Sequence, residues 1–287
     1  MASILDRYGI KEVADVTFYE INSDGTPGKP VLYLDTLKVS TIEQTAEQVD
    51  ARGGKGNPKL ITWDYGKEIT LNIEDALFSP KSMAIMLGDG TVTKAATDTV
   101  TRNNMVRATS SALPNYFVAD VYDATEGGAV RKKIFMGQGT APAGMVAFAD
   151  VQGISLAHVY DETGNEVKNG TAAITTPSLW QGASVTAGNK YFVQYTANAT
   201  TKTITVSGDT FPGTYYVQGD TYARSDVDGK DQFFQFIIPK AKMTAENTIT
   251  LEAEGDPSTF SMNLTVLRPE SGDMMKLVQY DLTGSAG

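Results

Sequence analysis

The sequence of 287 residues predicts an all-β protein, a β-barrel or sandwich with one short flanking helix and an inserted β-rich domain. Strand-like segments recur roughly every 10 to 15 residues, and turn signals separate them. Apolar and polar residues alternate at residues 60–74 and again from residue 190, which is typical of strands with one buried face. Helix signals occur at one short segment.

The first elements are predicted to be a hairpin and a long connection. Residues 16–21 and 31–40 have strand composition, and Asp24 and Gly25 between them favour a turn. Residues 43–58 carry scarcely any apolar side chain, and connections of this length are uncommon in compact domains unless they are functional or disordered. We expect either a surface loop or an arm that becomes ordered against a neighbouring subunit, formed by Glu43, Glu47, Asp50, Arg52, Gly53, Gly54, Lys55 and Gly56.

Residues 60–74 form the clearest predicted strand. The odd positions from Ile61 to Ile73 are largely apolar and the even positions are polar, so one face is expected to be buried. Gly66 interrupts the alternation, and a glycine inside a strand usually marks a bulge or bend. The segment is therefore expected to be two strand halves joined by a kink.

A short helix is predicted after this strand. Ser79 can cap the first amides, Pro80 suits the first helical position, and Gly88 can end the helix. An apolar stripe indicates that the helix packs on one face of a sheet. The stripe consists of Phe78, Met83, Met86 and Leu87.

The chain is predicted to have two domains. Residues 1–88 and 203–287 form a discontinuous β-barrel domain, and residues 89–202 form an inserted β-rich domain that is expected to face outward. The insertion begins where Thr, Ala, Asn and Ser become common. Its strands are expected at 116–122, 131–136 and 153–160, and strands at 233–238, 248–253 and 260–267 complete the first domain.

The composition argues against several kinds of chemistry. The chain has no cysteine and one histidine, His158, which lies in a predicted strand without the pattern of a catalytic triad or zinc site. Residues 226–231 resemble a calcium loop, but Arg224 and Gln235 stand where ligands are needed, and an Asp-Gly turn accounts for the segment. No glycine-rich phosphate loop joins a strand to a helix. We expect no cofactor, no metal and no enzymatic activity.

The charge and hydropathy limit the expected partners. A net charge of −10 argues against a protein that grips nucleic acid through its phosphates. No run of about 18 apolar residues is present, and the N-terminus lacks the pattern of a signal peptide. We expect no membrane insertion, and a protein that stays in the cytoplasm until assembly.

Two blocks of sequence resemble the tail tube (major tail) proteins of tailed bacteriophages. The first block covers residues 47–54, 60–71 and the helix start at Ser79 and Pro80. The second covers residues 229–243 and continues through 252–257 to 260–264. The blocks span under half of the chain, and the long middle, residues 89–202, departs from the pattern because a minimal tube subunit does not need it.

The resemblance implies a structural subunit of the virion tail, assembled in the host bacterial cytoplasm. Six copies are expected to form a ring whose sheets join edge to edge into one inner barrel, and rings are expected to stack into a tube. The lumen would conduct the genome during ejection without specific DNA binding, and the tube would form around a tape-measure protein. Sheath, baseplate and tail terminator proteins are further expected partners.

The even face of residues 60–74 is the predicted lining of this lumen. Repeated around a ring, its carboxylates would repel DNA phosphates and let the genome slide, whereas a basic lining would hold the DNA. The predicted lumen residues are Asp64, Glu68, Asn72, Glu74, Glu252 and Asn263, with Thr265 as a further candidate.

Other functions stay open at this stage. A capsid decoration or sheath protein would also be structural, but it would be a monomer or trimer instead of an open tube. The Thr, Asn and Tyr content of residues 171–222 suggests a cell-surface carbohydrate-binding domain as another alternative. An enzyme with paired carboxylates is the least favoured.

Overall fold

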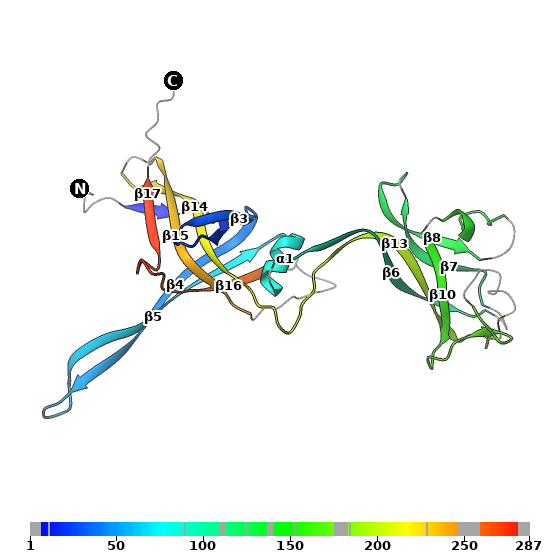
Figure 1. The fold of residues 1–287 in the computed structure, drawn as a ribbon, viewed down its shortest axis with the longest axis horizontal. Coiled ribbons are helices and arrows are strands. Elements are labelled where there is room, and N and C mark those ends of the chain that lie inside the picture. Colours follow the sequence, from blue (N-terminus) through cyan, green and yellow to red (C-terminus); the bar gives the residue numbers. More distant parts are fainter. Residues whose placement is uncertain are drawn as a thin grey trace, which may run out of the picture. The chain divides into compact units, whose positions relative to one another are not determined.

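The computed structural model shows an all-β chain that divides into two compact units (Figure 1). It describes residues 7–10, 12–88, 90–109, 113–123, 125–136, 140–151, 153–174, 183, 185–227, 229–245 and 259–280. Unit 1 comprises Met1–Thr93 and Thr203–Gly287, and unit 2 comprises Lys94–Lys202. The chain thus enters unit 2 from unit 1 and returns to it.

Unit 1 is built on one antiparallel sheet of nine strands. Its main path has the order β3-β2-β14-β15-β16-β5-β4, while β1 pairs with β14 and β17 pairs with β15. Strands from before and after unit 2 are therefore joined within one sheet. The strands are β1 (Tyr8–Ile10), β2 (Asp15–Ile21), β3 (Pro27–Leu34), β4 (Leu37–Arg52), β5 (Lys59–Asp75), β14 (Thr214–Ser225), β15 (Asp231–Met243), β16 (Phe260–Val266) and β17 (Lys276–Tyr280).

The core of unit 1 collects every second residue from these strands. This alternation is the period of two that places successive side chains on opposite faces. One cluster gathers side chains from most strands of the sheet, so the sheet curves around a single interior. Its buried members include Phe18, Leu34, Leu71, Ile73, Val217, Ile238, Met243, Met262 and Leu264.

Helix α1 (Pro80–Leu87) confirms the helix predicted at residues 79–88. The Ser82 backbone N–H donates to Ser79 Oγ at 3.0 Å, and the Ser79 N–H donates to Ser82 Oγ at 2.8 Å. This reciprocal capping satisfies two amides that a helix start otherwise leaves without partners. Ile85 and Met86 then pack into the unit 1 core.

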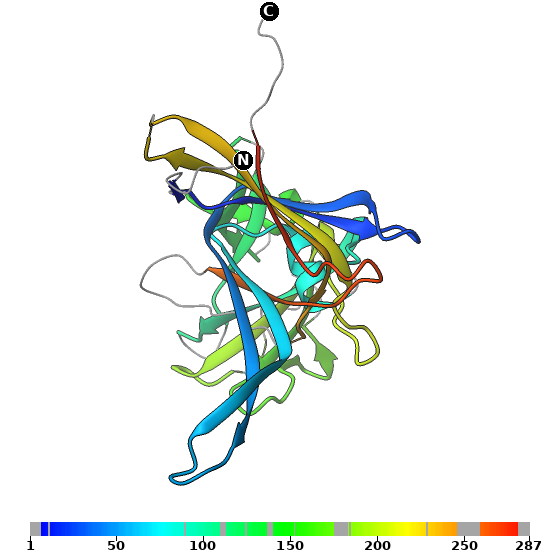
Figure 2. The ribbon, with the colours of Figure 1, turned by 90° about the vertical axis from the view of Figure 1, so that its left-hand side faces the viewer.

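Strands β4 and β5 continue beyond the rest of the sheet as a two-stranded hairpin, visible in both views (Figures 1 and 2). The expectation of a loop over residues 43–58 is therefore wrong, because β4 runs to Arg52 and only residues 53–58 form the turn. Cross-strand polar pairs account for the difference: Gln48 faces Asp64, and Asp50 faces Thr62. A two-stranded hairpin with solvent on both faces does not need buried apolar residues on each strand. A sequence search for buried residues therefore misses such a strand.

The described part of unit 2 contains three small sheets and a separate core. Phe117, Ile134, Val159 and Val193 are completely buried in it. Two three-stranded sheets have the orders β10-β13-β6 and β7-β8-β9, and β11 pairs with β12 in a two-stranded sheet. The elements are β6 (Thr93–Arg107), β7 (Tyr116–Asp123), β8 (Gly128–Phe135), β9 (Val146–Ala147), the 3-10 turn η1 (Phe148–Asp150), β10 (Ile154–Asp161), β11 (Lys168–Asn169), β12 (Ala172–Ala173) and β13 (Lys190–Thr203). The strand predicted at 248–253 lies outside the described residues.

Candidate functional site

One face of the unit 1 sheet is polar across three neighbouring strands. On β5, Leu71 is buried in the core, so Asn72 and Glu74 lie on the opposite face. Asn72 is paired with Thr41 of β4 on one side and with Asn263 of β16 on the other. We call this surface the polar face, and its members are Thr41, Glu43, Thr45, Glu68, Thr70, Asn72, Glu74, Ser261, Asn263 and Thr265.

The polar face is acidic. Glu43, Glu68 and Glu74 are exposed on it, and none of them forms an ion pair with another described residue. The row continues on β15 with Lys242, which is paired with Thr265 and whose ammonium group donates to the carbonyl of Pro212. Carboxylates without paired cations leave this surface with a negative potential.

A bulge at Gly66 changes which side chains share a face. Glu68 is paired with Thr45, and Tyr65 with Glu47, so two residues of β5 stand against Ala46 alone. Gly66 has a φ of 60° at this point, which glycine adopts without strain. Because of this extra residue, the odd-numbered side chains of β5 before Gly66 lie on the same face as the even-numbered side chains after it.

Asp64 consequently lies on the other face from Glu68 and Glu74. Its carboxylate accepts a hydrogen bond from the Gln48 amide at 2.8 Å, on the side that continues the core-facing surface. The expectation that Asp64 shares a face with these glutamates is wrong, because the alternation does not run unbroken through the bulge.

The same reversal brings apolar side chains to the outward side of the hairpin. Val49 is paired with Trp63, and Tyr65 and Ile61 flank Trp63 on the same face. We call these four residues the apolar stripe, and each leaves between 51 and 54% of its surface exposed. The prediction of one buried face over residues 60–74 holds for Ile69, Leu71 and Ile73 and fails for the outer half of the strand. The stripe is an exposed apolar patch of the kind that marks contact sites.

Polar contacts fix the end of the hairpin. Asp50 accepts a hydrogen bond from Thr62 Oγ1 at 2.8 Å, and Lys59 Nζ lies 2.7 Å from its carboxylate. The Lys59 ammonium, followed by the Thr62 hydroxyl, holds the pKa of Asp50 below its usual value. In the turn, Gly54 and Gly56 have φ values of 84° and 87°, which disfavour other residues. The arm is thus a built hairpin and not an unstructured connection.

A family model described as the YomU/Tube protein family matches residues 8–278. The chain belongs to the YomU/Tube protein family. Comparison with curated proteins gives no match. The name of the YomU/Tube family indicates a structural role connected with a phage tube, a place in the virion tail, and a non-enzymatic protein.

The YomU/Tube match spans the sheet of unit 1, its hairpin and all of unit 2.

Unit 1 also has an open groove of about 380 Å³ between the N-terminal segment, β4 and β15. Its walls combine the apolar residues Ile10, Val13, Val39, Ile42, Phe234 and Phe236 with the polar residues Glu12, Lys38, Ser40 and Thr221. The groove is therefore a second surface with exposed apolar groups, bordered by polar ones.

Apart from Asp64, the predicted lumen and arm residues fall into three groups. Glu68, Asn72, Glu74 and Asn263 come together on the polar face, whereas Glu252 lies outside the described residues. Glu43, predicted in the arm, also lies on the polar face. The other predicted arm residues occupy the outer hairpin and its turn, namely Glu47, Asp50, Arg52, Gly53, Gly54, Lys55 and Gly56.

The apolar stripe was not among the predicted site residues. The available signal was Gly66, because a bulge there implies that Trp63 and Ile69 occupy opposite faces despite their odd numbers. When a bulge places the apolar residues before it and after it on opposite faces of a strand, only one group can reach the core of the subunit. The other group is either buried against a different partner or left exposed.

The residues considered for other chemistry have structural partners. His158 Nδ1 lies 2.5 Å from Glu166 Oε1, and Arg224 donates two hydrogen bonds to Asp231 at 2.6 and 2.8 Å. Within the described ranges, no three metal-ligating side chains are grouped as a site, and no helix has the length and apolar character needed to cross a membrane.

Proposed function

We propose that this YomU/Tube chain is a phage tail tube subunit that self-assembles into stacked hexameric rings, with the polar face lining a lumen through which the genome passes. The observation that supports this best is the arrangement of unit 1. One sheet presents an acidic face opposite its core and extends a hairpin whose apolar stripe is exposed. A subunit that assembles needs both a solvated inner surface and a contact surface.

The hairpin is the proposed contact with a neighbouring subunit. Val49, Ile61, Trp63 and Tyr65 would gain about 25 cal/mol per Å² of apolar surface buried on a partner. The groove lined by Phe234 and Phe236 is the proposed receiving surface on the next copy. Contact between two different patches of identical chains generates a ring when the rotation closes.

The ends of the sheet are the second proposed contact. β3 and β4 stand at the two ends of the described pairing path. Unpaired strand edges favour pairing with another chain, and a ring resolves this liability by joining each edge to the next subunit. Six sheets joined in this way would make one continuous inner barrel.

The polar face is proposed to let DNA slide. Glu43, Glu68 and Glu74, repeated around a ring, repel phosphates, so the lumen does not gain affinity by releasing counterions from DNA. Unit 2 would then face outward, and the tube would form around a tape-measure protein and meet tail terminator, baseplate and any sheath proteins at its ends and surface.

Electron microscopy of the purified chain tests the proposal. After concentration at moderate salt, which screens repulsion between acidic subunits, negative stain is expected to show hollow tubes with six-fold end views. A double variant, Ile61→Thr with Trp63→Thr, keeps residues that favour strands but removes two of the four residues of the stripe, so it is expected to remain folded and fail to form tubes.

The matched control is Gln48→Thr, which alters the other face of the same hairpin and is expected to form tubes normally. Circular dichroism checks that each variant is folded. Tubes of normal length from the double variant would exclude the stripe as a contact. A wild-type protein that stays monomeric or trimeric at every concentration, with or without a preformed tail tip complex, would contradict the tube proposal and favour a decoration protein.

A further inference from the structure

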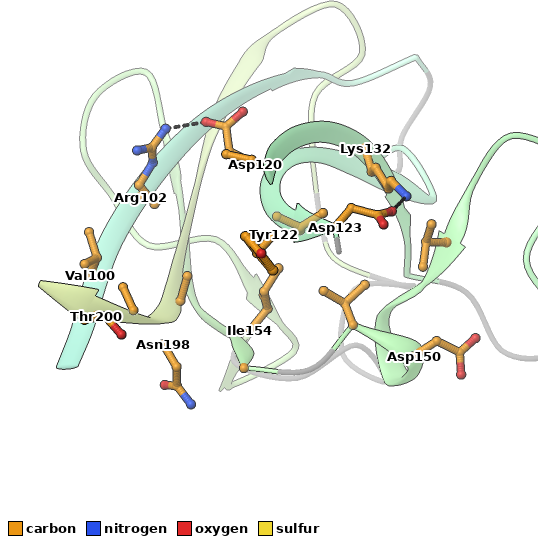
Figure 3. Close-up of a pocket in the computed structure, with 17 residues that line it drawn as sticks. Val100, Arg102, Asp120, Tyr122, Asp123, Lys132, Asp150, Ile154, Asn198 and Thr200 are labelled. Atoms are coloured by element: carbon orange, nitrogen blue, oxygen red, sulfur yellow. Dashed lines mark hydrogen bonds and ion pairs between the residues drawn. The ribbon is translucent and has the colours of Figure 1, made fainter. Parts of the chain in front are cut away.

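Unit 2 contains a large cavity that the tube function does not use. It has a volume of about 960 Å³, at the upper end of the range for ligand pockets, and it opens between β6, β13 and the β7–β8 hairpin (Figure 3). Its lining is more apolar than polar, with a few polar groups from separate strands. This composition is typical of a site that binds an organic ligand and not a bare ion.

Four charged side chains of the cavity are paired with one another, while the Asp150 carboxylate lines the cavity without an ion pair to another described residue. Asp120 pairs with Arg102 and with Arg131, whose Nε lies 3.1 Å from Asp120 Oδ1. Asp123 pairs with Lys132, and the Arg102–Asp120 and Lys132–Asp123 pairs are drawn in Figure 3. An anionic ligand would be repelled by the Asp150 carboxylate and would compete with the carboxylates of the two pairs, so the walls disfavour an anion and suit a neutral ligand.

The remaining groups combine an aromatic surface with hydrogen-bonding groups. Tyr122 lines the cavity beside Ile154, and 79% of its surface is exposed to solvent, so its ring offers a flat apolar surface to a ligand. Asn198 and Thr200 line the cavity from β13. The Asn198 side-chain amide makes no hydrogen bond with another described residue, so its two donors and its acceptor oxygen are available to a ligand.

From this combination we propose that the unit 2 cavity binds a neutral oligosaccharide. A sugar ring has an apolar face of C–H groups, which suits the Tyr122 ring, and an edge of hydroxyl groups, which suits the Asn198 amide and the Asp150 carboxylate. The cavity volume accommodates more than one ring. The site therefore takes a chain of neutral sugars and not a single charged one.

Titration of the full chain with neutral tetrasaccharides of glucose, galactose, mannose or N-acetylglucosamine tests the proposal. Saturation-transfer NMR and calorimetry are expected to detect binding of at least one of these probes. Tyr122→Ala and Asn198→Ala are each expected to weaken that binding about tenfold, because each removes one of the two kinds of contact. Tyr33→Ala is the matched control, since Tyr33 is an exposed tyrosine of unit 1.

Three results would overturn the proposal. The first is the absence of binding for all four probes at millimolar concentration. The second is binding that both cavity variants leave unchanged while circular dichroism shows them folded. The third is tighter binding of an acidic saccharide or of a peptide. The assay measures saccharide binding by the subunit itself. A negative binding result therefore does not affect the tube proposal, and saccharide binding can be measured even if the protein forms no tubes.

Discussion

Gly219 shows how a single position without a side chain shapes the unit 1 sheet. It lies on β14 opposite Phe236 of β15, and a Cβ built at Gly219 would stand 2.1 Å from Cε1 of the Phe236 ring. The ring therefore occupies the space above the glycine and is itself buried in the core. Glycine is needed here for room and not for an unusual backbone angle.

We expect Gly219→Ala to lower the free energy of unfolding by about 1–3 kcal/mol, because the methyl group displaces a buried ring in a close-packed core. Urea unfolding followed by tyrosine and tryptophan fluorescence measures the change. Gly9→Ala serves as the control, since a Cβ at Gly9 meets nothing within 4 Å. Equal stability of the two variants would show that Phe236 rotates away without cost.

At the scale of the element, the β4–β5 hairpin has two halves with different roles. The inner half buries Ile69, Leu71 and Ile73 in the core, and the outer half exposes the apolar stripe. The bulge at Gly66 is the boundary between them, because it reverses the alternation of faces. Only the inner half is held by the rest of the subunit.

Replacing Gly66 is therefore expected to loosen the outer hairpin alone. A left-handed backbone costs a branched residue about 1–2 kcal/mol, so Gly66→Val should speed amide exchange at residues 47–65 by about tenfold while exchange near Leu71 stays unchanged. Asparagine tolerates this conformation better, so Gly66→Asn is the control with a smaller effect. Hydrogen exchange measured by NMR gives both values, and uniform acceleration across β4 and β5 would contradict the division into halves.

The whole molecule combines two units, each with its own core. The buried cluster around Phe18 and Leu71 and the cluster around Phe117 and Val193 have no residue in common. The proposed assembly surfaces belong to unit 1, and the candidate ligand cavity lies in unit 2. Changes on the polar face should therefore affect the tube without affecting ligand binding.

Reversing charge on the polar face tests the proposed lumen. Tubes of Glu68→Lys with Glu74→Lys are expected to retain double-stranded DNA, and to release it as salt rises, because the lining becomes basic. Glu20→Lys with Glu270→Lys, both exposed elsewhere in unit 1, is the control with the same net charge. Co-sedimentation of tubes with labelled DNA measures retention, and equal retention by both variants would mean that Glu68 and Glu74 do not line the lumen.

Local signals in the sequence were sufficient for the all-β class and for the helix. Alternation marks strands, and Ser79 and Pro80 fix the start of α1, because capping and backbone preference act within a few residues. The bulge at Gly66 was also predictable, because glycine weakens the interior of a regular strand and is favoured where the backbone bends.

The faces and partners of the strands were decided by the tertiary structure. The sequence alone groups Asp64 with Glu68 and Glu74 and predicts a loop where β4 runs to Arg52. It assigns Asn72 and Asn263 to the same surface but does not show that they are directly paired. Pairing register between distant strands follows from the energy of the whole sheet, and a single inserted residue reverses every face beyond it. The sequence pattern shows which residues alternate along a strand. Only the folded sheet determines which face of the strand packs in the core and which face is exposed to solvent.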